Sequence, residues 1–443
     1  MVQKMKNLCG EIKKSFSELS GKSKLSTVFM GSGQFLYGAY GKGVMFLLLE
    51  VMFLVYFIRR GFKDIAGFFT LGSVAADPWS GTAGDNSVTM LLMGILAWIF
   101  LAAFVIIYIG NLKDALAVQR AYIAGKKPEK FIKEVAGLFD KKFYAFVLVL
   151  PVFGVFVFNV LPIVFMILIA FTNYGGDIVP PALVDWVGLQ NFAKIVSLSE
   201  FAPTFFHILI WNIVWAVIST ALNYFAGLFL ALLLNKECVK GKAFFRAFPV
   251  LAYAVPGFIT LLAFKFMFSY GGPINQMIVS GGGKAIGFLD IDAKWTARII
   301  GILVNCWISV PSIMMLATGN LSNRDKSIYE AAKIDGATPF QQFKALTLPF
   351  MIFVTTPVLL GQFVGNFNNF GIFYFLRGGL YMDNYFLASD TDLLINWLYN
   401  LSIDNNYYCI GAAISLVIFI ITSTISLIVY VKSPAYREED RFQ

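Results

Sequence analysis

Long apolar runs alternate with short polar segments along most of this sequence. A helix needs about 20 mostly apolar residues to cross the hydrocarbon core of a membrane. The strands of a membrane β-barrel would instead show alternation in segments of about ten residues. The continuous runs therefore predict an all-α polytopic membrane protein. The eight candidate spans lie at residues 38–58, 89–110, 143–171, 204–235, 246–269, 297–318, 346–367 and 406–431.

The spacing of these runs divides the chain into four parts. Residues 1–37 form a basic cytoplasmic or interfacial lead-in, and residues 38–142 hold two N-terminal spans and a second basic segment. Residues 143–431 form a six-helix core, and residues 432–443 form a tail. The first span is the weakest because it contains Glu50. The second basic segment, "KKPEKFIKEVAGLFDKK", has apolar residues at helical spacing and predicts an interfacial helix, with a partner-binding helix as the alternative.

Composition and charge agree with a membrane protein and set its orientation. The chain is 58% hydrophobic and 14% charged, with a net charge of +9. With the N-terminus inside, the inner segments carry 26 Lys and Arg and the outer segments seven, while Lys265 and Arg298 lie within spans. Cytoplasmic loops carry the excess of Lys and Arg, so both termini are predicted to be cytoplasmic. The basic charge orients the chain, and without a basic groove or motif no nucleic acid is expected as a partner.

The sequence predicts no catalytic site. None of its five Gly-Lys pairs has a glycine five residues earlier, as a phosphate-binding Walker loop requires. The single histidine, His207, has no metal-binding companion nearby. An ion-coupled secondary carrier would place ionisable groups near mid-membrane. Only Glu50, Lys265 and Arg298 qualify, and the carrier stays open as an alternative.

One polar segment, "EAAKIDGATPFQQFKALTLPF" at residues 330–350, stands between the sixth and seventh spans. The charge count places it inside the cell. Its first residues predict a short helix, after which Gly336 permits a turn. Asp335 or Thr338 can cap a second helix after the turn, and Pro339 suits its first turn. The pattern predicts a helix–turn–helix with small residues on its exposed crown.

This segment closely resembles the coupling loop of ABC importer permeases. The family signature is Glu-Ala-Ala, three residues, Gly, and after nine more residues often Ile/Leu-x-Leu-Pro. The matching residues here are Glu330, Ala331, Ala332, Gly336 and "LTLP" at 346–349, with Asp335 and Ala337 as in sugar importers. Other stretches are similar to the maltose/maltodextrin permease subunit: "FTNYG" (171–175), "VGLQNF" (187–192), "GKAFFRAFPVLAYAVPGF" (241–258), "GGPINQM" (271–277), "FNNFGIFYFLRGG" (367–379) and "TDLLIN" (391–396). The short connection between the third and fourth spans is similar to the short-loop form of Gram-positive bacteria.

The resemblance implies an assembly and a transport function. The chain would be one permease of a heterodimer in the bacterial plasma membrane, with two ATPase subunits and an extracellular solute-binding lipoprotein as partners. Its coupling loop, residues 322–349, would dock into an ATPase. The chain itself would hold no cofactor, because the ATPase subunits bind ATP and Mg. It would translocate an oligosaccharide, maltose or maltodextrin, by alternating access, with a different sugar as the alternative.

The resemblance also implies a sugar site midway across the membrane. Tyr253 and Asn305 match the family in residue type. Aromatic stacking and polar side chains suit a sugar, although helix–helix hydrogen bonding is the alternative role for such residues. Because part of the lining departs from the family, maltose itself stays open. The positions that differ from the family or match it less clearly are Gly257, Ser309, Ser312 and Gln362.

Overall fold

The computed structural model describes residues 19–433 and 436, apart from 78, 80, 126–142, 200 and 237. The predicted interfacial helix and most of the predicted tail lie outside these residues. Within them the chain forms helices and connecting loops, and the only β pairing is a few isolated bridges. The predicted all-α fold is confirmed.

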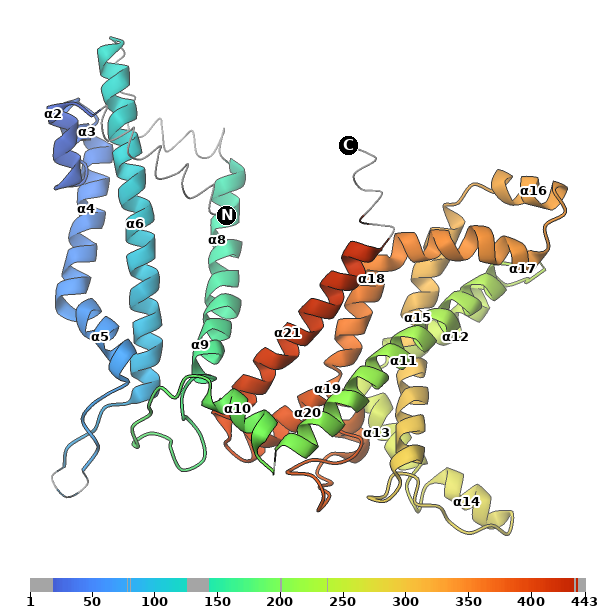
Figure 1. Ribbon diagram of the computed structural model, residues 1–443. Coiled ribbons are helices and arrows are strands. Elements are labelled where there is room, and N and C mark those ends of the chain that lie inside the picture. The colour runs from blue at the N-terminus through green and yellow to red at the C-terminus, as the bar shows by residue number, and fades with distance from the viewer. Residues whose placement is uncertain are drawn as a thin grey trace. The chain divides into compact units, whose positions relative to one another are not determined.

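The chain divides into two compact units, one up to Val187 and one from Gly188. This boundary falls after the first span of the predicted six-helix core. Figure 1 shows the described helices of each unit. Those of the first unit are α2 (Gly21–Lys24), the 3₁₀ turn η1 (Leu25–Thr27), α3 (Ser32–Leu36), α4 (Tyr40–Tyr56), the π turn η2 (Phe57–Gly61), α5 (Phe62–Thr70), α6 (Ser87–Ile123), α8 (Phe143–Val155), the π turn η3 (Phe156–Val160) and α9 (Leu161–Ile169).

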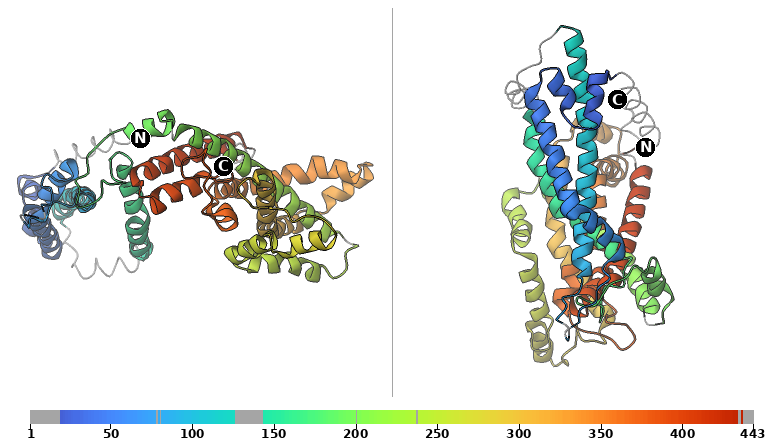
Figure 2. Two further views of the ribbon diagram at one scale, coloured as in Figure 1. Left: turned by 90° about the horizontal axis from the view of Figure 1, so that it is seen from below. Right: turned by 90° about the vertical axis from the view of Figure 1, so that its left-hand side faces the viewer.

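In the first unit, the helical stretch from α4 to α5 lies beside α6 (Figures 1 and 2). The Asn86 side chain accepts a hydrogen bond from the Thr89 N–H (3.0 Å) and so caps the start of α6. A Cβ atom at Gly94 of α6 would lie 2.4 Å from the Cβ of Phe68 on α5. Glycine at this position therefore allows the close approach of the two helices.

Residues 19–37 of the predicted lead-in fold onto the cytoplasmic ends that we predict for α4 and α6. The Asn111 side chain of α6 accepts a hydrogen bond from the Gly31 N–H (3.0 Å). Glu50 of α4 accepts one from the Met30 N–H (2.8 Å), which gives this carboxylate a structural partner. The segment is thus held by buried polar contacts in addition to any interaction with the membrane surface.

The second unit is built around the long helix α11, which packs against α15 and α18 (Figure 1). A Cβ atom at Gly227 would lie 2.6 Å from the Ile313 Cβ, so glycine lets α11 approach α15 closely. Its described helices are α10 (Gln190–Ser197), α11 (Ala202–Asn235), α12 (Lys242–Ala254), α13 (Gly257–Met267), α14 (Pro273–Ser280), α15 (Lys294–Ser322), α16 (Ser327–Ile334), α17 (Pro339–Gln342), the π turn η4 (Phe343–Thr347), α18 (Leu348–Phe367), α19 (Phe370–Arg377), α20 (Leu394–Tyr399), the π turn η5 (Asn400–Asp404) and α21 (Tyr408–Lys432).

Two buried clusters of apolar side chains stabilise this unit. One joins α11, α13, α15 and α19 through residues such as Trp215, Val304 and Phe373. The other joins α11, α15 and α18 through residues such as Leu228 and Met351. Burial of such side chains contributes roughly 1.5–3 kcal/mol each in water, and in a membrane close packing takes over part of that role.

Seven helices in the described residues are long and apolar enough to cross a membrane, and the number rises to eight if one bent pair forms a single span. The first predicted span is among the seven, within a helical stretch over Tyr40–Thr70. The predicted fifth span, 246–269, is the bent pair: α12 and α13 meet at an angle of 92°. Pro256 causes the break, because proline has no N–H and disfavours helical geometry in the preceding residue.

Candidate functional site

The coupling loop has the helix–turn–helix form that its sequence predicts. α16 ends in a left-handed turn at Gly336, with φ of +77°. The Gly336 N–H donates to the Lys333 carbonyl (3.1 Å), and the Ala337 N–H donates to the Ala332 carbonyl (2.9 Å). These two bonds form a Schellman motif, which satisfies carbonyl groups at a helix end and favours glycine.

Thr338 begins the second helix of the loop. Its hydroxyl accepts a hydrogen bond from the Gln341 N–H (3.3 Å), and its own N–H donates to the Gln341 side chain (2.7 Å). Pro339 occupies the first turn of α17, as predicted. Of the two candidate caps, Thr338 fills the role, whereas Asp335 is the C-terminal cap of α16.

The crown of the loop is exposed and mixes small with apolar residues. Glu330, Ala331, Asp335 and Gly336 are exposed, and Ala332 and Ala337 are half-buried. Ile334 is 86% exposed and Phe340 is 71% exposed. Two large apolar side chains beside a crown of small residues are typical of a surface that contacts another protein.

The proposed sugar residues fall into an exposed and a buried group. Tyr253 on α12 is 54% exposed, and Gly257 is an exposed residue at the start of α13, across the bend from it. Asn305 on α15 is buried. The other three are half-buried: Ser309 and Ser312 on α15 and Gln362 on α18.

Asn305 belongs to a buried row of polar side chains. Its amide N–H donates to the Asn366 side-chain oxygen on α18 (3.2 Å), and its oxygen accepts from the Asn369 amide (3.2 Å). The Asn366 amide in turn donates to the Thr220 hydroxyl on α11 (3.0 Å). These contacts join three membrane helices, so Asn305 has a structural role whether or not it also contacts sugar. Ser312 likewise donates within α15, to the Ser309 carbonyl (2.7 Å).

A pocket of about 720 Å³ lies on the bent pair and α15. Within the described part of the chain, none of the six proposed sugar residues lines it, although it includes the sequence neighbours of Tyr253 and Asn305. Its lining is mainly apolar and includes the aromatic residues Phe248 and Trp307. The lining residues are Leu230, Phe248, Pro249, Leu251, Ala252, Val255, Thr260, Leu303, Cys306, Trp307, Val310 and Pro311.

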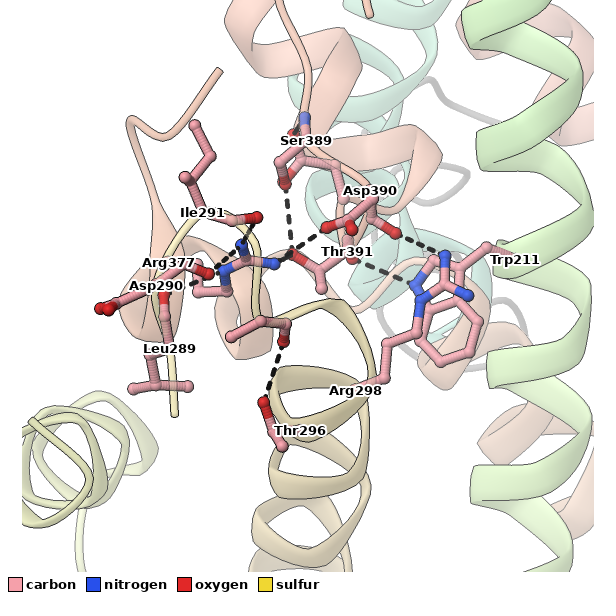
Figure 3. A network of polar contacts seen from close by, with 12 residues as sticks. Trp211, Leu289, Asp290, Ile291, Thr296, Arg298, Arg377, Ser389, Asp390 and Thr391 are labelled. Carbon is pink, nitrogen blue, oxygen red and sulfur yellow. Dashed lines mark hydrogen bonds and ion pairs between the residues drawn. The ribbon is translucent and has the colours of Figure 1, made fainter. Parts of the chain in front are cut away.

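A buried ionic network fixes the connection that follows α19, as Figure 3 shows. The Arg377 guanidinium pairs with the Asp390 carboxylate (3.0 Å) and also donates to the Thr391 hydroxyl (2.9 Å). On its other side it donates to the backbone carbonyls of Asp290 (2.7 Å) and Ile291 (3.0 Å). One buried arginine thus ties the loop 378–393 to the loop before α15.

Arg298 takes part in the same network. Its guanidinium donates to the Asp390 carbonyl, and its Cζ atom lies 3.8 Å from the centre of the Trp211 ring (Figure 3). Of the ionisable residues considered for an ion-driven carrier, Arg298 and Glu50 therefore have structural partners. Lys265 is exposed in the last turn of α13.

Asp392 is a second buried carboxyl in this loop. Burial raises the pKa of Asp392 to about 6, although the Ser389 N–H donates to it (2.8 Å) and favours the charged form. Sequence reasoning did not find this residue, Asp390 or Arg377. The sequence signal that could have indicated Arg377 is an arginine that directly follows an apolar stretch, in "FLRGG".

Comparisons with known proteins decide the family. No protein-family model matches the chain. The maltodextrin transport system permease protein MalC of Streptococcus pneumoniae is 35% identical over 431 residues, which are 95% of this chain and 97% of MalC. The chain belongs to the permease family of ABC sugar importers. The nearly complete coverage of both chains agrees with the predicted short-loop form.

The permease is also similar to proteins that handle other sugars. The galactooligosaccharides transport system permease protein GanP of Bacillus subtilis is 34% identical, over 94% of this chain and 98% of GanP. A subunit in the crystal structure of a bacterial ABC transporter that imports the polysaccharide alginate matches with a TM-score of 0.55 and 19% identity. The match covers 68% of the permease and 98% of the alginate transporter subunit, so the two proteins share a fold.

Proposed function

We propose that this permease moves maltodextrins through the plasma membrane by alternating access, driven by ATPase subunits docked on its coupling loop. The observation that carries the proposal is the exposed Schellman turn at Gly336, with small residues on its crown. The maltodextrin permease MalC, at 35% identity, supports the choice of sugar.

The assembly we propose has four kinds of partner. A second permease completes the translocation path, two ATPase subunits bind and hydrolyse ATP with Mg, and an extracellular binding lipoprotein delivers the sugar. The permease chain itself binds no cofactor in this scheme. The excess of Lys and Arg in alternate connections supports cytoplasmic termini, and the coupling loop then faces the ATPase subunits.

The geometry supports a mechanical role for α15 and α18. Both helices lead directly from the coupling loop into the membrane, and both carry polar residues of the proposed sugar region. A movement of the loop towards or away from the membrane would therefore displace the proposed site. Alternating access requires two such positions of the proposed site, one open to each side of the membrane.

A galactooligosaccharide is the second candidate substrate, since GanP is 34% identical over nearly the same length. The two are separated by an uptake assay on cells that express the complete importer, with maltotriose and a galactotriose offered separately and together. We expect uptake of maltotriose that an excess of galactotriose does not reduce. Uptake of galactotriose alone would contradict maltodextrin as the substrate, while uptake that survives loss of ATP would contradict the importer.

Tyr253→Ala is expected to raise the KM for maltotriose up to about tenfold, because a stacking contact of an aromatic ring contributes roughly 0.5–1.5 kcal/mol beyond its buried area. The ring is 54% exposed, so its removal should leave the melting temperature of the purified permease unchanged. Asn305→Ala is the contrasting variant, because it breaks the buried amide row and should lower that temperature. An unchanged KM in Tyr253→Ala would remove this residue from the sugar site.

A further inference from the structure

Arg324 lies where three parts of the coupling loop meet. It follows the end of α15 at Ser322 and precedes α16, which begins at Ser327. Its Nη1 atom donates to the Tyr329 hydroxyl on α16 (2.7 Å) and to the Leu346 carbonyl oxygen in the π turn η4 (2.8 Å). The Arg324 side chain, which follows the end of α15, thus contacts both α16 and the π turn that leads into α18.

Three further contacts close this arrangement. The Tyr329 hydroxyl lies 2.9 Å from the Thr347 hydroxyl, and Thr347 is only 4% exposed. The Arg324 Cζ atom lies 5.0 Å from the centre of the Tyr329 ring and 4.6 Å from that of Phe350 on α18. We call Arg324, Tyr329, Thr347 and Phe350 the Arg324 cluster.

The cluster contrasts with the rest of α16. The crown residues from Ile334 to Gly336 are exposed, whereas Tyr329 and Arg324 are partly buried at its base. Hydrogen bonds from a charged donor are about twice as strong as neutral ones, and a planar guanidinium can bond and stack at the same time. The Leu346 carbonyl that accepts from Arg324 lies in the π turn η4. Such turns are frequent at functional sites.

We propose that Arg324 is a positioning residue for energy coupling: through the Arg324 cluster it joins α16 to α15 and α18, so that both membrane helices follow a displacement of the coupling loop. This inference rests on the proposed function. If α16 were attached only through flexible connections, it would rotate when the docked ATPase moved, and the displacement would not reach α15 and α18. A helix held at its base on both sides transmits the displacement to both.

The test uses the complete importer in proteoliposomes, with its own binding protein and maltotriose as the sugar. ATP hydrolysis and maltotriose uptake are measured in the same vesicles, and their ratio is the readout. We expect Arg324→Met to lower the maltotriose transported per ATP hydrolysed about fivefold, at the lower end of the coupling between linked sites. The amount of co-purified ATPase and the KM for maltotriose should not change.

Three further variants separate positioning from general damage. Tyr329→Phe removes one oxygen atom from the cluster and should lower the same ratio, while adding little to Arg324→Met because both act through one contact. Arg324→Lys keeps the charge and should restore part of the ratio. Lys432→Met removes an exposed cation at the end of α21, outside the coupling loop, and should leave the ratio unchanged.

Each other outcome has a definite meaning. A normal ratio in both Arg324→Met and Tyr329→Phe would overturn the inference and leave the proposed function intact. Loss of co-purified ATPase in Arg324→Met would also overturn it, since Arg324 would then serve docking. An unmodified importer whose uptake is independent of ATP would overturn the proposed function, and this inference with it.

Discussion

Gly336→Asp is expected to abolish sugar uptake while the permease remains folded and inserted in the membrane. No atom of the chain lies within 4 Å of the position of an added Cβ, so the substitution has room. The left-handed backbone, with φ of +77°, costs a non-glycine residue about 1–2 kcal/mol, and aspartate tolerates it better than most. The new carboxylate would stand on the crown where we propose the ATPase docks, and we expect uptake to fall about 100-fold.

The measurement is maltotriose uptake by cells, divided by the amount of permease in their membranes. Gly282→Asp is a matched control, because Gly282 ends α14 in the same Schellman geometry, with φ of +85° and open space around it. The control variant should keep its uptake. Normal uptake in Gly336→Asp would exclude this turn from the docking surface, and loss in both variants would assign the effect to backbone strain.

Arg377→Met is expected to destabilise the permease by about 3–5 kcal/mol, the range for removing one partner of a buried ion pair. Arg377 is fully buried, and its removal would leave the Asp390 carboxylate and the carbonyls of Asp290 and Ile291 without their donor. The melting temperature of the detergent-purified chain should fall, and less protein should accumulate in the membrane.

Two further variants are compared with Arg377→Met. Arg60→Met removes the partner of an ion pair in which the arginine side chain is 60% exposed, and such pairs contribute only about 0–1 kcal/mol. The double variant Arg377→Met with Asp390→Leu removes the stranded charge and should recover part of the stability. A melting temperature in Arg377→Met equal to that of Arg60→Met would show that the buried pair has no stabilising role.

The coupling loop shows how far local sequence can determine a site. Gly336, Thr338 and Pro339 occupy the positions that their backbone and capping preferences predict. Each of these preferences acts within four residues, so neighbouring residues suffice to decide the turn. The same holds for the spans, because a run of apolar side chains can be satisfied only within the membrane or a large core.

Long-range contacts set the limit of that reasoning. Asn305 was predicted to contact sugar from the resemblance to the family, and the structure places its amide between Asn366 and Asn369. Asn305 and Asn366 are 61 residues apart, on different helices, and no local pattern relates them. Arg377 and Asp390 are 13 residues apart across an irregular loop, so their pairing depends on how that loop folds over α15.

The sequence by itself determined that the chain spans the membrane as helices, where most spans lie, and the turn of the coupling loop. Apolar run length and turn chemistry are properties of adjacent residues, so they need no knowledge of the packed structure. Only the tertiary structure decided the buried amide row, the Arg377–Asp390 pair and the contacts of Arg324. Each of these depends on which helices lie side by side, and that arrangement is set by the packing of the whole unit.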